Sequence, residues 1–343
     1  MSTQRSLLLQ GPQGAFVVRD RPIPEPGPGE ILVKIYAAAL NPIDWKVRKY
    51  NVHLSSYPAI LGLDGAGDVV KIGEGVSNFV PGDKVFFPGV YDSKGATWQQ
   101  YALADAEFAA KIPSNISYDQ ATTIPTGLTT PYNAFYQGWG LTLPTKSAGG
   151  LGKYAGTPIL VIGGSSAVGQ FAIQLAKASG FSPIITTSSL KHTDHLKSFG
   201  ATHILNRHNP LSTLAGDVAK ITSTLPYAYD AVALPDAQQA VYDLLSDGGK
   251  LATVLPPRIP NSIRTKEGDG KVVHQVQAMR TIPGQEEKLA EGYRNWTEWL
   301  QTGLIKPQPL EVLPNGLNGI ADGLQRLEDD KISGIKLVAH PWD

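Results

Sequence analysis

The segment most informative about the fold is PILVIGGSSAVGQFAIQLAKASG, residues Pro158–Gly180. It begins with a continuous apolar run, which is typical of a strand buried on both faces. Small residues follow from Gly163 to Ala167, and the apolar residues after them recur at helical spacing. Backbone N–H groups at such a turn can approach a pyrophosphate at the helix N-terminus. The segment therefore predicts the strand, turn and helix of a dinucleotide-binding site. The alternative is an ordinary strand-turn-helix that binds no ligand.

The turn departs from the usual G-x-G-x-x-G pattern at its central position. Gly164 and Gly169 stand first and last, and Ser166 replaces the central glycine. The serine hydroxyl is able to donate a hydrogen bond to a phosphate. The cofactor contacts predicted in this turn are Gly164, Ser165, Ser166, Ala167 and Val168.

The residues after the next strand indicate which dinucleotide is bound. A NAD site usually has an acidic residue about 20 positions after the last glycine, where it binds the ribose hydroxyls. Here the position 19 residues after Gly169 is Ser188, in TTSSLKH. The donors and cations that suit an additional phosphate are Ser188, Ser189, Lys191, His192 and Arg207. This set predicts NADPH, unless Lys191 and Arg207 are ordinary surface charges.

Composition excludes several classes of protein. The 343 residues suggest two domains, and 30 Lys and Arg balance 30 Asp and Glu, so no net field attracts nucleic acid or anionic lipid. Without cysteine there are no disulfides, thiolate nucleophiles or cysteine-bound zinc. The early apolar run is too short for a signal peptide, and no stretch is long enough to span a bilayer. We expect a cytoplasmic protein that does not associate with membranes.

The two parts of the chain differ in the secondary structure that their sequence patterns predict. Short β-branched runs separated by Gly and Pro predict antiparallel strands at Ile31–Leu40, Ala66–Gly73 and Asp83–Gly89. Helical spacing begins at Tyr118, with interruptions expected at Pro125 and Pro131. Strands and helices then alternate from about residue 158 to 254, which predicts a parallel, doubly wound sheet. The expected fold class is α/β, with an irregular β domain beside this sheet.

The stretch LGLDGAGDVVKIGEGVSNFVPGDKV, residues Leu61–Val85, resembles the signature of medium-chain dehydrogenases/reductases. In zinc members of that family this signature begins with G-H-E, whereas here Gly62 is followed by Leu63 and Asp64. Asn41 stands where another ligand, a cysteine, would be, and Pro125–Gly127 supplies no third ligand. The cysteine-rich lobe that binds structural zinc is also absent. The resemblance therefore implies a metal-free member of the family.

The same resemblance implies the domain organisation. A GroES-like domain would take residues 1–129 and 299–343, and a Rossmann domain would take 130–298, with the active site between them. Further motifs are similar to the stand-alone enoyl reductases (ToxD-like and CipB-like) of fungal secondary metabolism, which use NADPH to reduce activated C=C bonds. These motifs are NPIDWK (Asn41–Lys46), GATWQQY, TSSLKHTDHLKSFGA (Thr187–Ala201) and SGIKLV (Ser333–Val338).

Cofactor contacts outside the turn follow from position in these motifs. The resemblance implies contacts from Pro42, Ile43, Asp44, Trp45, Leu255, Ser333 and Lys336, in addition to the phosphate-binding set above. Arg207 stands where related chains often have a tyrosine against the adenine, and a guanidinium plane can also stack there.

Lys46 and Tyr50 are the candidate catalytic residues. The resemblance places Lys46 beside the nicotinamide, where a cation would orient a substrate carbonyl, and the alternative is a solvated lysine. The Tyr50 phenol would protonate an enolate, or would simply pack. Asp44 is a local structural or ribose contact rather than a base. Trp45, Trp98 and Tyr132 either wall a substrate cleft or belong to the core.

Together these features predict an NADPH-dependent enoyl reductase that transfers hydride to the β-carbon of an α,β-unsaturated carbonyl compound without a metal. A quinone oxidoreductase, or an NADPH-binding sensor or scaffold, is the alternative. The expected partner is a small enone, enoyl ester or quinone. The sequence leaves open whether the substrate is free or attached to a carrier protein. The protein would be a monomer or a homodimer. The histidines at 192, 195, 203 and 208 are spread over different elements and form no metal-ligand set.

Overall fold

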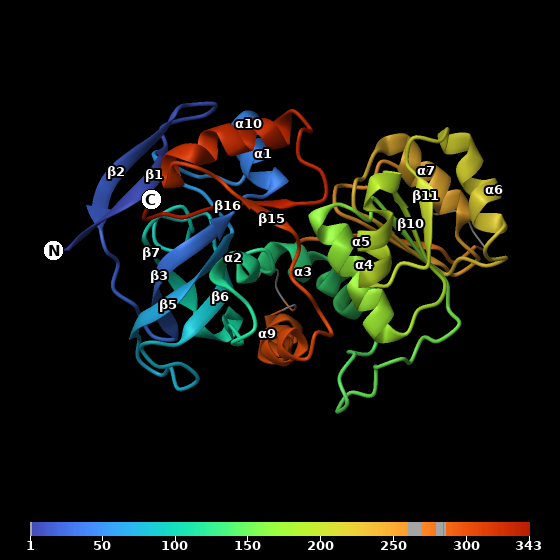
Figure 1. Cartoon of the computed structure of the whole chain (residues 1–343), viewed down its shortest axis with the longest axis horizontal. Coiled ribbons are helices and arrows are strands. Elements are labelled where there is room, and N and C mark those ends of the chain that lie inside the picture. The colour runs from blue at the N-terminus through green and yellow to red at the C-terminus, as the bar shows by residue number, and fades with distance from the viewer. Residues whose placement is uncertain (1, 260–268, 279–283, 285) are drawn as a thin grey trace. The chain divides into compact units, whose positions relative to one another are not determined.

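The computed structural model describes residues 2–259, 269–278, 284 and 286–343. The chain divides into two compact units, each described separately (Figure 1). Unit 1 comprises Met1–Thr126, Leu289–Gly303 and Pro307–Asp343, and unit 2 comprises Gly127–Lys288 and Leu304–Lys306. The first unit is built mainly of irregular β-structure and the second around a parallel sheet, so the expected fold class is confirmed.

Unit 1 contains two sheets. The smaller has the order β2-β1-β4, with β1 at Thr3–Leu9, β2 at Phe16–Pro22 and β4 at Ala59–Ile60. The larger has the order β15-β16-β3-β5-β6-β8, and β7 also pairs with β3. Its strands are β3 (Glu30–Ala39), β5 (Asp64–Ile72), β6 (Lys84–Pro88), β7 (Tyr101–Asp105), β8 (Ala110–Lys111), β15 (Leu310–Val312) and β16 (Lys336–Ala339).

Strand β3 is the centre of unit 1. Its sequence EILVKIYAAA is apolar at most positions, and seven of its ten residues are buried, which suits a strand covered on both faces. It pairs antiparallel with β5, β7 and β16. Strand β16 therefore brings a late segment of the chain beside the end of β3, and this contact positions the polar cluster described below.

The helices of unit 1 are α1 (Pro42–Tyr50), α2 (Tyr118–Ala121), most of α9 (Glu286–Gln301) and α10 (Ile320–Glu328), with 3₁₀ turns η1 (Ala106–Phe108) and η5 (Gly316–Gly319). Sequence spacing did not predict α1. It starts immediately after β3, where Asn41 is extended and Pro42 occupies the first helical turn. Helix α1 packs along α10, as Figure 1 shows.

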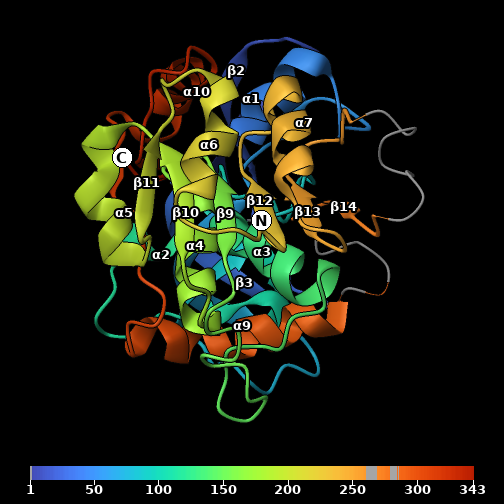
Figure 2. The same ribbon diagram turned by 90° about the vertical axis from the view of Figure 1, so that its right-hand side faces the viewer.

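Unit 2 contains a six-stranded sheet in which every neighbouring pair is parallel (Figure 2). The strand order is β11-β10-β9-β12-β13-β14. Its strands are β9 (Ile159–Ile162), β10 (Ile184–Ser188), β11 (His203–Asn206), β12 (Tyr227–Asp230), β13 (Lys250–Thr253) and β14 (Val272–Gln275). The order reverses between β9 and β12, which is the switch point at which such sheets bind ligands.

Helices cover both faces of this sheet. The helices are α3 (Pro125–Tyr132), α4 (Ala167–Ser179), α5 (Thr193–Phe199), α6 (Leu214–Ala219) and α7 (Pro235–Leu244), with short turns η2 (Asn133–Gly138), η3 (Leu190–His192) and η4 (Leu211–Thr213). Figure 1 shows α4 and α5 on one face and α6 and α7 on the other. The doubly wound arrangement predicted from the alternating pattern is confirmed.

The two prolines near the start of unit 2 act differently. Pro125 begins α3, where a missing N–H costs nothing, so it starts a helix rather than interrupting one. Pro131 lies inside the helix, and the next residues form the π-helical turn η2. A proline in a helix interior removes a backbone hydrogen bond, so the interruption expected at Pro131 coincides with the end of regular α-helix at Tyr132.

In the described part of the chain, no helix combines the length and apolar character that a bilayer crossing requires.

Candidate active site

The predicted dinucleotide turn lies in unit 2 between β9 and α4. The Ser166 hydroxyl accepts a hydrogen bond from the Gly169 N–H at 3.1 Å and so caps α4. The other first-turn N–H groups point along the helix axis toward the carboxyl end of β9, as in sites that bind phosphate. The serine at the central position therefore has a local structural role that the sequence pattern did not assign to it.

Glycine is required at both ends of this turn. Gly163 has a φ of 76°, a conformation that residues with a side chain rarely adopt. A Cβ on Gly169 would lie 2.3 Å from the Gly163 carbonyl oxygen and 2.9 Å from the Gly164 Cα. Because those atoms are backbone, no side-chain rotation can relieve the clash. Helix α4 therefore lies as close to β9 as a backbone permits.

Basic residues gather after β10 and β11. Ser188 ends β10 with its side chain buried, and its hydroxyl donates to the Ser189 carbonyl at 3.2 Å. The Arg207 N–H donates to the Ser188 carbonyl at 2.9 Å, so Arg207 follows β11 directly beside this point. Burial lowers the pKa of His192, and the nearby charges of Lys191, His195 and Arg207 lower it further. The structure thus brings the predicted cations together, while the Ser188 side chain faces the protein.

Leu255 lies just after β13, at the same edge of the sheet. Its side chain is partly exposed and its carbonyl oxygen accepts a hydrogen bond from the Thr253 hydroxyl. Ser165, Ala167 and Val168 lie at the turn and at the start of α4 with intermediate exposure. Their roles as cofactor contacts stay predictions.

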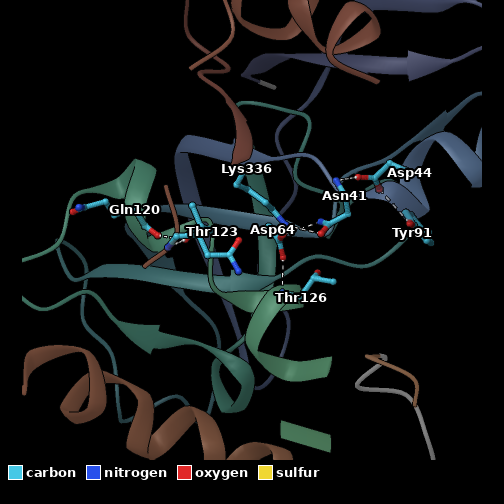
Figure 3. Close-up of polar contacts among 9 residues, drawn as sticks. Asn41, Asp44, Asp64, Tyr91, Gln120, Thr123, Thr126 and Lys336 are labelled. Carbon is cyan, nitrogen blue, oxygen red and sulfur yellow. Dashed lines mark hydrogen bonds and ion pairs between the residues drawn. The ribbon is translucent and has the colours of Figure 1, made fainter. Parts of the chain in front are cut away.

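A buried polar cluster in unit 1 joins the start of α1 to two strands (Figure 3). The Lys336 ammonium donates to Asn41 Oδ1 at 2.6 Å and lies 3.0 Å from Asp64 Oδ2. Asn41 Nδ2 donates to the same Asp64 oxygen at 2.8 Å, and the Thr126 N–H donates to Asp64 Oδ1 at 2.7 Å. Side-chain exposure is 3% for Lys336 and 0% for Asp64. We call Asn41, Asp64 and Lys336 the polar triad.

Asp44 extends this cluster along α1. Its carboxylate accepts a hydrogen bond from the Asn41 N–H at 2.7 Å and another from the Tyr91 hydroxyl at 3.2 Å. Burial, with a contribution from the charge of Asp64, raises the pKa of Asp44 to about 7, although the Asn41 N–H and the Lys336 charge oppose the shift. The sequence predicts a local structural or ribose contact for Asp44. Its contacts with Asn41 and Tyr91 are local and structural, and a contact with the ribose stays a prediction.

The raised pKa of Asp44 predicts that stability falls as pH rises. The folded carboxyl holds its proton up to about pH 7, whereas an unfolded aspartate loses it near 3.8. Between these values the folded state binds more protons, so the free energy of unfolding should fall by up to ~1.4 kcal/mol per pH unit. Asp44→Asn should flatten this slope in urea denaturation at pH 5 and pH 7. The exposed Asp194→Asn is the control, and an unchanged slope in Asp44→Asn would contradict the assignment.

The candidate catalytic residues lie on α1. The Lys46 ammonium lies 5.5 Å from the centre of the Trp45 ring, and burial lowers the pKa of this lysine. No carboxylate in the described residues pairs with it. The Tyr50 side chain is 57% exposed, and its ring lies 6.1 Å from that of Trp45. Among the described residues Lys46 is thus a partly buried cation without a carboxylate partner, while Tyr50 is largely exposed.

Two aromatic residues considered for a substrate cleft belong to the cores of their units. Trp98 is fully buried in unit 1, with its ring 5.9 Å from that of Phe16. Tyr132 is fully buried in unit 2, and its hydroxyl donates to the Lys288 carbonyl at 2.7 Å.

The donor set near Asn41 does not fit a zinc ion. The position expected for a cysteine ligand holds the Asn41 amide, whose oxygen accepts from the Lys336 ammonium, and Leu63 replaces the histidine. A cation bound here would face a buried positive charge and would have no imidazole or thiolate ligand. Across residues 2–259, 269–278 and 286–343, no group of three or more His, Cys, Asp or Glu is placed to hold a metal.

The chain matches two families of known proteins. Residues 27–114 match the alcohol dehydrogenase GroES-like domain, and residues 167–281 match the family called zinc-binding dehydrogenase. A zinc-type alcohol dehydrogenase-like protein of Schizosaccharomyces pombe is 30% identical, in a match that covers 97% of this chain and 99% of that protein. The chain belongs to the medium-chain dehydrogenase/reductase superfamily. This confirms the resemblance drawn from the Leu61–Val85 signature.

Several relatives of this medium-chain dehydrogenase/reductase carry a more specific name. The trans-enoyl reductase resD of Aspergillus sclerotiorum is 31% identical, with 97% of this chain and 99% of that protein covered. A solved alcohol dehydrogenase superfamily protein from Novosphingobium aromaticivorans has a TM-score of 0.82 at 23% identity, covering 97% of this chain and 99% of that one. The quinone oxidoreductase from Coxiella burnetii has a TM-score of 0.75 at 24% identity, covering 98% and 99%. At these identities the solved structures show the fold alone.

Membership of the superfamily makes the protein an oxidoreductase, and its Rossmann-like sheet indicates a nicotinamide cofactor. The residues of unit 2 fit such a group, because the capped helix, the glycine turn and the basic residues lie where phosphates bind. Sequence reasoning missed Tyr91. It considered Thr126 only within Pro125–Gly127, which supplies no metal ligand, and Asp64 only as the residue after Leu63, which replaces the ligand histidine. No local pattern marks these three, because they are brought together by pairing between distant segments.

Proposed function

We propose that this protein is an NADPH-dependent reductase of the C=C bond in α,β-unsaturated carbonyl compounds. The basic residues after β10 and β11, with Ser188 in place of an acidic residue, are the observation that supports NADPH. The names of the trans-enoyl reductase relatives support the choice of bond. Quinone reduction would use the same hydride, so it is an outcome that the test below must separate.

The proposed reaction needs few groups from the protein. NADPH, when bound, supplies the hydride that reaches the β-carbon as the C=C π bond breaks. The negative charge that develops on the substrate carbonyl oxygen can be stabilised by hydrogen-bond donors, without a metal. We assign this role to the Lys46 ammonium, because it lacks an acidic partner in the described residues. A proton from the Tyr50 phenol or from water then completes the reduction at the α-carbon.

Different residues are proposed to bind the different parts of the cofactor. The start of α4 would hold the pyrophosphate through its N–H groups, and Lys191 and Arg207 would hold the 2′-phosphate. Pro42, Ile43, Trp45, Leu255 and Ser333 are proposed as further contacts, from the resemblance alone.

Lys46→Met should lower kcat by about 100-fold, as loss of one donor to a developing oxyanion does in other enzymes. The dissociation constant for NADPH should stay within about twofold, because the amine acts on developing charge rather than on ground-state binding. Steady-state kinetics and fluorescence titration measure the two quantities. Lys71→Met is the control, since Lys71 lies on β5 of the same unit and pairs with Glu25 at the surface. An unchanged kcat in Lys46→Met would make Lys46 a surface lysine.

Lys191→Ala combined with Arg207→Ala should weaken NADPH binding by about 100-fold or more, since hydrogen bonds to charged groups contribute about 1.5–3 kcal/mol each. NADH binding should change little because NADH has no 2′-phosphate. Calorimetric titration with both cofactors gives the ratio. Lys197→Ala, on α5 beside these residues, is the control. Equal losses for both cofactors would place the 2′-phosphate elsewhere.

The function itself is tested with a panel of acceptors. Enones and trans-2-enoyl thioesters should consume NADPH and yield saturated products, and deuterium from labelled NADPH should appear at the β-carbon. Turnover only with benzoquinones would favour a quinone oxidoreductase. Tight NADPH binding without oxidation by any acceptor would favour a sensor or scaffold.

A further inference from the structure

Helix α1 has a narrow apolar face: Val47 belongs to the core of unit 1, and Ile43 and Trp45 pack against that core. The helix contains nine residues, of which only Asp44 and Val47 are buried. A helix of this length is marginal on its own, so its position depends on contacts with the rest of unit 1. One such contact is the Lys49–Glu328 ion pair, but its side chains are 48% and 25% exposed, and exposed pairs contribute little.

The polar triad provides a buried contact at the start of α1. Asn41 immediately precedes the helix, and its side chain is held on both sides, by the Lys336 ammonium at the oxygen and by Asp64 at the nitrogen (Figure 3). The Asn41 N–H also binds the Asp44 carboxylate one turn into the helix. Every member of the triad is buried, so water does not compete for these bonds.

Strand pairing fixes the position of Lys336. Val338 and Ala339 pair with Ala39 and Ala38, and the Leu40 N–H donates to the Leu337 carbonyl at 2.9 Å. The lysine thus projects from a strand that is hydrogen-bonded to the residues directly before Asn41. Of its three ammonium hydrogens, two have acceptors in the described residues, and both acceptors belong to the triad.

We propose that Lys336 is a positioning residue, which fixes the first turn of α1 through the Asn41 side chain and so orients Trp45 and Lys46 for the reaction. The part that concerns the reaction rests on the function proposed above. This role differs from the direct cofactor contact that the resemblance implied for Lys336, because the ammonium acts here on the protein and not on the dinucleotide.

The test compares Lys336→Met, Asn41→Ala and the double variant by hydrogen exchange of the peptide covering residues 42–50. Lys336→Met leaves Asp64 buried without its cation and is the variant at risk of misfolding. Asn41→Ala keeps the Lys336–Asp64 ion pair, so it tests the same connection in a folded protein. Lys331→Met is the control, because Lys331 lies close by in the chain and pairs with Asp329 at the surface.

We expect exchange in α1 to rise at least tenfold in Asn41→Ala and in Lys336→Met, with α10 unchanged and no further rise in the double variant. kcat should fall in both single variants while the dissociation constant for NADPH stays within about twofold. Unchanged exchange in Asn41→Ala, or additive effects in the double variant, would overturn the proposal. Loss of NADPH affinity confined to Lys336→Met would indicate direct cofactor binding instead. The exchange results hold even if no enone is reduced, so failure of the proposed function is recognised separately.

Discussion

Asp64→Ala should lower the free energy of unfolding by about 3–5 kcal/mol, the cost found when one partner of a buried ion pair is removed. The Asp64 carboxylate accepts hydrogen bonds from Asn41 Nδ2 and the Thr126 N–H, and it is the only carboxylate in the described residues that pairs with the Lys336 ammonium. Without it, the described residues leave the buried Lys336 ammonium with one acceptor, the Asn41 amide oxygen, and no carboxylate within ion-pair distance. Urea denaturation monitored by fluorescence measures the loss.

Two controls separate charge from packing. Asp329→Ala removes an exposed partner of Lys331 and should cost no more than ~1 kcal/mol. Asp64→Asn combined with Lys336→Met removes both charges while nearly conserving volume, so it should recover much of the stability lost in Asp64→Ala. A loss below ~1 kcal/mol in Asp64→Ala would mean that water reaches the triad and screens it.

Gly169→Ala should destabilise unit 2 by about 1–3 kcal/mol, as overpacking does elsewhere, and should weaken NADPH binding at least tenfold. The added methyl group would lie 2.3 Å from the Gly163 carbonyl oxygen, so α4 must move away from β9. That movement displaces the helix N-terminus from the position in which it binds phosphate. Thermal denaturation and calorimetric titration measure the two effects.

Gly216→Ala is the matched control. Gly216 lies in α6 of the same unit, and a Cβ there would meet no atom within 4 Å. Alanine in an open helical position should leave stability unchanged or raise it by about 0.5–1 kcal/mol. If Gly169→Ala behaved like Gly216→Ala, close packing of α4 against β9 would not be what the turn requires.

The sheet of unit 2 was predictable because its signal is local. Ile159–Ile162 and the following helix carry their burial pattern in consecutive residues, and β10, β12 and β13 are also mostly buried, whereas the two edge strands β11 and β14 are not. The strands β1 and β2 were missed because they alternate weakly, and Leu7–Leu9 was interpreted only as a short apolar run. Helix α1 was missed for a different reason, since its residues have little apolar periodicity and its stability comes from tertiary contacts.

The candidate site was predictable only in part. Lys46 and the basic residues after β10 were found because they lie inside or beside recognisable motifs. The hydrogen bond between Lys336 and Asn41 joins residues 295 positions apart, and no sequence pattern near either residue predicts the contact. Sequence reasoning predicts that the Ser166 hydroxyl donates to a phosphate, but it missed that the same oxygen accepts from the Gly169 N–H and caps α4.

The pairing of β16 with β3 has a consequence for synthesis of the protein. A ribosome completes β3 early, and β7, which pairs with Glu30–Lys34, soon after. Strand β16, which pairs with Ala38 and Ala39 at the end of β3, is made only after the whole parallel sheet of unit 2 has been translated. Until then the nascent N-terminal segment has an unpaired edge at Ala38 and Ala39, and the buried Asp64 lacks the Lys336 ammonium. Such edges invite pairing with other chains, so the N-terminal part should depend on chaperones during translation while unit 2 can fold as it emerges.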